Sequence, residues 1–129
     1  MDWVEKLPSQ CPPPDAVPPE GEYYRAVSVD CSEKDFIPYA RLYPNRKYRG
    51  AMACVSRALS IYTDIDDCIN VTKLPAFQNS GQTHIAKVVL TGKDGLVLKG
   101  KNKDSHLSWW RTNDFDINTS VEPINTSEL

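Results

Sequence analysis

Residues 84–98 read HIAKVVLTGKDGLVL, and this stretch decides the fold that the sequence predicts. Its first part, residues 84–90, is almost continuously apolar and rich in β-branched side chains, which is typical of a buried strand. Residues 96–98 are apolar again, and the Asp94-Gly95 pair between the two runs is a strong hairpin signal. We therefore expect two adjacent antiparallel strands, joined by a tight turn, at the centre of a sheet.

Further strands are expected on both sides of this hairpin, at residues 22–30, 58–62 and 105–111, where strand-forming residues are concentrated. Ser32 begins a capping-box pattern that predicts a short helix, which Pro38 limits to a turn or two. Thr63 precedes three aspartates and predicts the start of a second short helix, which Pro75 ends. The order of elements predicts a small α+β domain with a mainly antiparallel sheet.

A length of 129 residues suits one domain. Residues 1–21 contain six prolines, which exclude helix and inner strand, so we expect an extended arm along the surface with its start pinned by Trp3. Residues 22–112 form the α+β domain. Residues 113–129 lack periodicity and are expected to be a loose C-terminal tail.

Composition narrows the class of protein. A net charge of −2 leaves no whole-surface basic field of the kind that drives nonspecific nucleic-acid binding. No apolar run approaches the roughly 18 residues of a membrane helix, and the first residues show no basic leader followed by an apolar segment. We therefore expect a soluble cytoplasmic protein that makes no membrane contact.

The four cysteines are Cys11, Cys31, Cys54 and Cys68, and none lies in a C-x-x-C pair. This spacing argues against a zinc knuckle or a thioredoxin-like motif. Four cysteines permit three disulfide pairings, but free buried thiols are the expected state in the cytoplasm.

A basic and aromatic stretch between residues 39 and 57 is the first candidate site. Guanidinium groups bind phosphates and tyrosines offer stacking faces, so the stretch suits a nucleotide or a single-stranded nucleic acid. A solvated loop whose arginines pair with nearby acids is the structural alternative. The candidate phosphate or nucleic-acid residues are Arg41, Arg46, Lys47, Tyr48, Arg49 and Arg57.

His84 and His106 are the only histidines, and both fall on predicted strands. If they meet in space, they are candidate catalytic residues for acid–base work near neutral pH. No third ligand follows from the spacing, so no metal site is expected. A structural role in the strands is the alternative.

Trp109 and Trp110 are adjacent on a predicted strand and therefore point to opposite faces. One can fill the core. The other, beside Arg111, is a candidate anchor for a protein partner, unless the proline-rich arm covers it.

The succession of Tyr24-Arg25, a basic loop and the segment RALSIYTDIDD at residues 57–67 resembles the layout of small ADP-ribosyltransferase-like domains, including the toxin type that degrades NAD. The resemblance spans about residues 22–90 and implies that Arg25 and Tyr62 bind NAD. The catalytic glutamate of those enzymes has no match, and Asp66 or Asp67 would have to replace it. The chain is also similar to small bacterial proteins that combine a Tyr-Arg strand with a His and Trp-Trp strand, a likeness that brings no activity with it.

Three functions remain open. A non-enzymatic binding or accessory protein with a protein partner requires least of the sequence. An ADP-ribosyltransferase-like or NAD-hydrolysing enzyme follows from the resemblance. A single-stranded nucleic-acid-binding module follows from the basic stretch. The sequence does not decide whether the chain is an enzyme, and it names no cofactor beyond the nucleotide that the resemblance implies.

Overall fold

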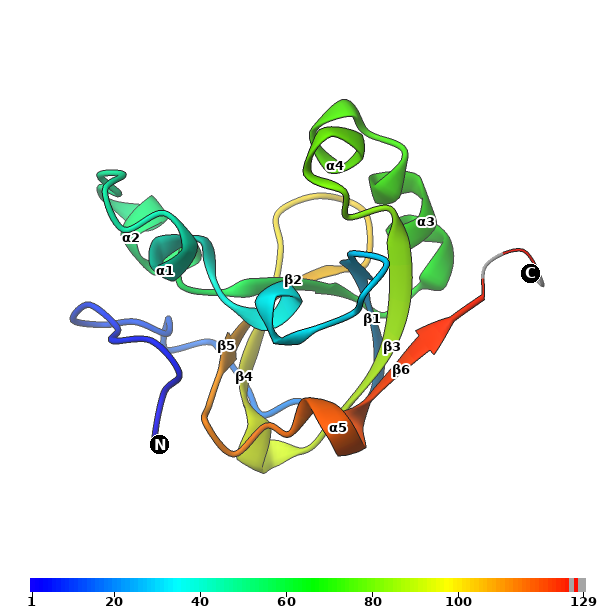
Figure 1. Cartoon of the computed structure of the whole chain (residues 1–129). Helices are drawn as coiled ribbons and strands as arrows, with labels where there is room; N and C mark the ends of the chain where they lie inside the picture. The colour runs from blue at the N-terminus through cyan, green and yellow to red at the C-terminus, as the bar shows by residue number, and fades with distance from the viewer. Residues whose placement is uncertain (126, 128–129) are drawn as a thin grey trace.

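A computed structural model describes residues 1–125 and 127. Its centre is a curved six-stranded sheet (Figure 1) in the order β4-β5-β2-β1-β3-β6, with each neighbouring pair antiparallel. The strands are β1 (Gly21–Val27), β2 (Leu59–Tyr62), β3 (His84–Leu90), β4 (Gly95–Lys99), β5 (His106–Arg111) and β6 (Val121–Ile124). With the short helices around it, this sheet confirms the predicted α+β class.

The helical elements are η1 (Glu33–Phe36), α1 (Tyr39–Leu42), α2 (Ala51–Val55), α3 (Ile65–Thr72), α4 (Pro75–Ser80), η2 (Gly92–Asp94) and α5 (Ile117–Ser120). The predicted capping box at Ser32 is present and opens η1. The second predicted helix is α3, although Asp64 rather than Thr63 is its N-cap. Pro75 does follow the end of α3, but it also begins α4, because proline fits the first turn of a helix.

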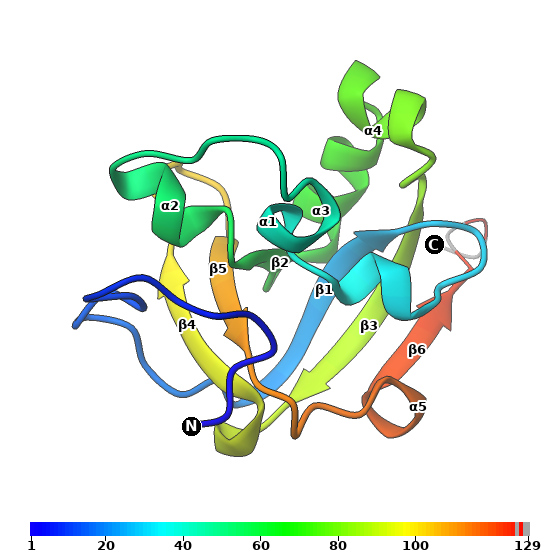
Figure 2. The same cartoon turned by 60° about the vertical axis from the view of Figure 1, so that its left-hand side comes forward.

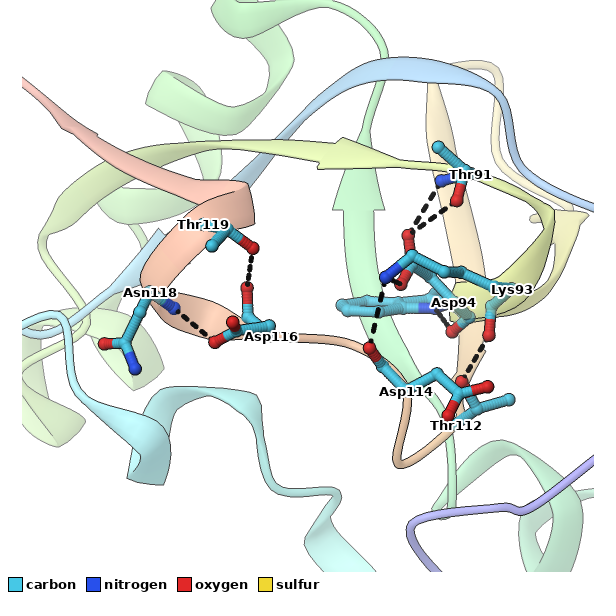
Figure 3. A network of polar contacts seen from close by, with 9 residues as sticks. Thr91, Lys93, Asp94, Thr112, Asp114, Asp116, Asn118 and Thr119 are labelled. Atoms are coloured by element: carbon cyan, nitrogen blue, oxygen red, sulfur yellow. Dashed lines mark hydrogen bonds and ion pairs between the residues drawn. The ribbon is translucent and has the colours of Figure 1, made fainter.

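The predicted central hairpin is wrong. β3 pairs with β1 and β6, whereas β4 pairs with β5 at the other side of the sheet. The reason lies in Asp94, whose carboxylate accepts a hydrogen bond from the Thr91 backbone N–H at 2.8 Å and so closes the turn η2 (Figure 3). Asp94 is therefore part of a 3-10 turn that redirects the chain, and Gly95 follows it with φ of 139° instead of completing a hairpin turn.

Both faces of the sheet are covered. One face packs into a core cluster that includes Phe36, Ile61, Val88 and Trp109. A second cluster, around Ala26, Tyr62, Cys68 and Ile85, lies beneath α3. Because both faces are buried, some strands are continuously apolar in sequence and do not alternate between apolar and polar residues.

The proline-rich segment lies on the surface, and Figure 2 shows it in blue beside β4. It is less extended than expected, because backbone hydrogen bonds from Cys11 to Pro8 and from Ala16 to Pro13 close two turns within it. Val17 pairs with Val97 on the edge of β4, and Trp3 pairs with Thr112 at the start of the arm. No helix in the described part of the chain has the length and apolar character needed to cross a membrane.

Cys11 of the arm and Cys54 of α2 form a disulfide, with their Cα atoms 5.6 Å apart. The expectation of free thiols is therefore wrong for this pair, and it is confirmed for Cys31 and Cys68. Spacing alone carries no signal for the pairing, since the arm brings together two residues 43 positions apart.

The segment after residue 112 is more ordered than the predicted loose tail. Phe115 is buried in the core, and β6 pairs with β3 through Val121 opposite Val88 and Ile124 opposite Ile85. The rest of that prediction concerns residues 126, 128 and 129, which lie outside the described residues.

Candidate anion-binding site

A cavity of about 300 Å³ lies between the sheet and the helices that precede β2. β1 and β2 contribute Arg25, Ser60 and Tyr62, while α1 and the loop after it contribute Tyr39 and Arg46. The volume is at the lower end of the range for small-molecule sites, which are mostly apolar with a few polar groups.

Arg25 is the most unusual of the lining residues, because it is a charged side chain with only 8% of its surface exposed. β1 and β2 pair at one position, Tyr24 opposite Tyr62. Next to this position, the Arg25 guanidinium connects the two strands by a hydrogen bond. Its Nη1 donates to the Ser60 carbonyl oxygen at 2.7 Å, and its Nε donates to the Asp35 carbonyl oxygen at 2.8 Å. The sheet and η1 therefore hold the guanidinium in a fixed orientation.

The charge of Arg25 has no counterion within 4 Å among the described residues. The nearby Asp35 carboxylate instead accepts hydrogen bonds from Ser28 and from the Ser32 backbone. Burial lowers the pKa of Arg25 from its ordinary value, yet a guanidinium stays protonated in proteins. Two of its five N–H donors are used by carbonyl oxygens, so an anion entering the cavity would supply both the missing charge and acceptors for the others.

The mouth of the cavity adds positive charge and aromatic surface. Lys34 and Arg46 are exposed cations of its lining, and Tyr39 and Tyr48 are its aromatic neighbours. Inside, burial raises the pKa of Tyr62 to about 12, with nearby Asp104 adding to the effect. Tyr62 therefore keeps its phenolic proton and can donate a hydrogen bond near neutral pH.

The structure brings together the two residues that the NAD resemblance pointed to. Arg25 and Tyr62 line the same cavity as Arg46 and Tyr48 of the basic stretch. The other members of that stretch lie elsewhere: Arg41 donates to the Val4 carbonyl oxygen at 3.1 Å, Arg57 donates to the Ala53 carbonyl oxygen, and Lys47 and Arg49 are exposed outside the lining.

The two histidines do not meet. His106 is opposite Tyr62 on β5 and β2, and His84 is opposite Val27 on β3 and β1, so three strand spacings, roughly 14 Å, separate them along the sheet. His106 Nε2 is instead 2.9 Å from Ser60 Oγ, and burial lowers the pKa of His106. The predicted histidine pair is therefore wrong, and no group of three His, Cys, Asp or Glu that suits a metal exists among the described residues.

The tryptophans do not provide an exposed anchor. Trp109 and Trp110 are 0% and 1% exposed, and their Nε1 atoms donate to the carbonyl oxygens of Asp94 and Cys54. The hydrogen bond to Cys54 shows that α2 covers the outward indole, in place of a partner. Arg111 is also buried, donating to the Phe36 carbonyl oxygen and pairing with Glu33, both at 2.8 Å.

Sequence reasoning missed Lys34 and Ser60 as lining residues. Lys34 lies within the capping-box pattern, so the sequence pattern assigns it only to the start of a helix. Ser60 is the polar residue between the apolar Leu59 and Ile61 of a predicted strand, and nothing in the neighbouring sequence indicates that it lines a cavity. Their place in the cavity depends on the packing of η1 and β2, which the local sequence does not encode.

Comparison of the chain with family models, with curated proteins and with solved structures found no match. The resemblance to ADP-ribosyltransferase-like domains therefore stays a prediction, and the functional argument rests on the geometry of the cavity.

Proposed function

We propose that the protein is a binding domain for a small organic anion with an aromatic ring, the chemical class to which mononucleotides belong. The observation that carries this proposal is Arg25, a buried guanidinium that lines a cavity without a carboxylate partner among the described residues. A buried charge of this kind costs free energy unless something compensates it. An anionic ligand provides that compensation.

The remainder of the lining fits the rest of such a ligand. Tyr39 and Tyr48 offer aromatic contact, Met52 and Val55 offer apolar contact, and Arg46 stands at the mouth. We place the anionic group of the ligand on Arg25 and its ring against the tyrosines.

Binding is a better account of this cavity than cleavage of NAD. None of the described lining residues is acidic, and none is a histidine. Of the two aspartates that would have to replace the missing glutamate, Asp67 accepts a hydrogen bond from the Ser105 backbone at 2.8 Å, and neither Asp66 nor Asp67 lines the cavity. NAD is therefore tested as a ligand, and a non-enzymatic binding protein remains the favoured class.

The test is a thermal-shift titration with adenosine monophosphate, NAD, inorganic phosphate and uncharged adenosine. A ligand that binds the native state raises the unfolding midpoint by mass action. We expect adenosine monophosphate to raise the midpoint and adenosine to do so much less, because only the former supplies an anion to Arg25. Equal shifts for both ligands, or no shift with any of the four, would contradict the proposal.

Two variants locate the binding. Arg25→Gln should abolish the ligand-induced shift, but it also loses hydrogen bonds to two carbonyl oxygens and starts from a lower midpoint. Lys34→Ser removes an exposed cation of the lining and should weaken the shift while the starting midpoint stays the same. Lys101→Ser, an exposed lysine outside the lining, is the matched control and should titrate like the wild type.

The disulfide favours an oxidising compartment over the cytoplasm as the place of action. Disulfides persist in oxidising surroundings and are rare in cytosolic proteins. Alkylation of the protein in its source, followed by denaturation and mass spectrometry, should find Cys11 joined to Cys54 and free thiols at Cys31 and Cys68. Four alkylated cysteines would restore the cytoplasmic expectation.

A further inference from the structure

Residues 39–55, which form α1, α2 and the loop between them, make a lobe at one side of the sheet, called here the α1–α2 lobe (Figures 1 and 2). Its surface combines exposed apolar or aromatic side chains with exposed cations. Its exposed apolar and aromatic side chains are Tyr39, Leu42, Tyr43, Met52 and Val55, each more than 40% exposed. Its exposed cations are Arg41, Arg46, Lys47 and Arg49.

The charge of the lobe differs from that of the remaining chain. No acidic residue occurs between Asp35 and Asp64, so the four cations of the lobe have no acid beside them in sequence. The whole chain has a net charge of −2, which makes the rest of the molecule acidic. An anionic surface would attract the lobe and repel the remainder, and this difference would orient the molecule with the lobe forward.

We propose that the α1–α2 lobe docks on the headgroup region of an anionic lipid bilayer. Cations attract anionic headgroups, and exposed apolar and aromatic side chains enter the boundary between headgroups and acyl chains. The lobe presents both kinds of group together, whereas the basic side chains alone would suit any polyanion. This surface overlaps the lining of the Arg25 cavity, which includes Tyr39, Leu42, Arg46, Met52 and Val55. Tyr43, Arg41, Lys47 and Arg49 of the lobe lie outside that lining and distinguish the two sites.

The contacts of the tyrosines favour lipid over a single-stranded nucleic acid. Bases bind by stacking on free aromatic faces. Here the Tyr43 ring, outside the cavity, already has two neighbours: the Tyr39 ring, with centroids 6.0 Å apart, and the Arg46 guanidinium, 4.2 Å from the Tyr43 centroid. The exposed apolar side chains of Leu42, Met52 and Val55 suit the boundary of a bilayer.

The lobe is also held in place. The disulfide joins Cys54 of α2 to Cys11 of the arm, and the Cys54 carbonyl oxygen accepts the Trp110 indole N–H at 3.1 Å. Arg41 donates to the arm at Val4. A surface fixed in this way loses less conformational entropy on docking than a flexible loop would.

The test is co-sedimentation of the intact protein with vesicles of phosphatidylcholine alone and of phosphatidylcholine mixed with phosphatidylglycerol. We expect binding to the anionic vesicles, little binding to the neutral ones, and a decrease as salt is added. Lys47→Ser/Arg49→Ser should lower the partition coefficient by about 25-fold, since each cation near a bilayer contributes about five-fold. Lys101→Ser/Lys103→Ser, which removes the same charge from another exposed segment, should bind like the wild type.

The apolar contribution has its own pair of variants. Tyr43→Ser should weaken vesicle binding, while Val29→Ser, at an even more exposed position away from the lobe, should not. The proposal would be overturned if the lobe double variant and the Lys101→Ser/Lys103→Ser control lost vesicle binding equally, or if the wild type did not bind anionic vesicles. Binding to oligothymidylate without binding to vesicles would assign the lobe to nucleic acid instead. Tyr43, Lys47 and Arg49 lie outside the cavity lining, so these outcomes are independent of nucleotide binding.

Discussion

Arg25 and Arg111 are both buried arginines of the sheet, and they resolve the burial of a charge in different ways. Arg111 has a carboxylate partner in Glu33 and lies 5.0 Å from the centroid of the Phe115 ring, so its charge is compensated inside the fold. Arg25 has carbonyl oxygens as hydrogen-bond acceptors and a cavity beside it. Arg25 also lies 5.7 Å from the centroid of the Phe36 ring, so the two arginines differ in the ion pair that Arg111 forms and Arg25 does not. This difference is the reason why we propose Arg25, and not Arg111, as a binding residue.

His106 supports a prediction about pH. Burial lowers its folded-state pKa below the ordinary 6.5, so the unfolded chain takes up a proton first as the pH falls. Stability should therefore decrease as the pH drops through about 6.5 and level off below the folded-state pKa. Urea unfolding at several pH values measures this, and His106→Gln should flatten the decrease between pH 7.5 and 5.5.

The exposed His84 provides the control for this experiment. His84→Gln leaves the buried imidazole in place and should keep the decrease seen in the wild type. If both variants flatten it equally, His106 is not its source.

Among the elements, the turn η2 has the strictest backbone requirement. Gly95 has φ of 139°, and a Cβ atom there would lie 2.0 Å from the Trp110 carbonyl oxygen. Gly95→Ala should therefore cost at least about 4 kcal/mol of unfolding free energy, or prevent folding, because the obstacle is backbone of the neighbouring strand. Chemical denaturation monitored by tryptophan fluorescence measures the loss.

Gly81, the C-cap of α4, is the matched comparison. Its φ of 81° is also unfavourable for alanine, but nothing lies within 4 Å of an added Cβ. Gly81→Ala should cost only about 1 kcal/mol, the strain of a left-handed residue. A similar cost at both glycines would mean that η2 can shift to make room.

The positions of the strands were predictable where the residues of the strand itself carry the signal. The five predicted strands all exist, because apolar and β-branched runs depend on burial of the segment itself. β6 escaped prediction because Glu122 and Pro123 make it look like a loop, and proline is tolerated on an edge strand. The pairing of β3 was wrongly predicted because Asp94-Gly95 suits both a hairpin turn and the end of a 3-10 turn. Only contacts with β5, such as the hydrogen bond from the Trp109 indole to the Asp94 carbonyl oxygen, select the second.

The candidate site was predictable in part for the same reason. Arg25, Tyr62 and two members of the basic stretch, Arg46 and Tyr48, were recognisable as residue types, but their common cavity depends on contacts among β1, β2 and α1. The histidine pair failed because two strands that look equivalent in sequence lie three positions apart in the sheet.

For the whole molecule, the disulfide is the main covalent constraint, since it joins the arm to α2 across 43 positions. A loop of this length corresponds to about 4 kcal/mol of stabilisation in the chain-entropy treatment, and measured values are often lower. Cys11→Ser/Cys54→Ser should therefore reduce the unfolding free energy by about 2–4 kcal/mol in a denaturation experiment.

Cys31→Ser is the control, because Cys31 is a half-buried thiol without a disulfide partner. It should change the unfolding free energy by less than about 1 kcal/mol. A double variant as stable as this control would show that the arm stays in place through its prolines and backbone hydrogen bonds alone.

The strand order also determines when the sheet can be completed. β1, which lies inside the sheet, has as its longest partner β3, at residues 84–90, and β3 in turn pairs with β6 near the C-terminus. Such pairings close long loops before they gain any contact, which slows folding compared with a sheet of successive hairpins. On the ribosome, β1 emerges well before residues 84–90, so the edge of β1 that pairs with β3 stays unpaired until that partner has been synthesised.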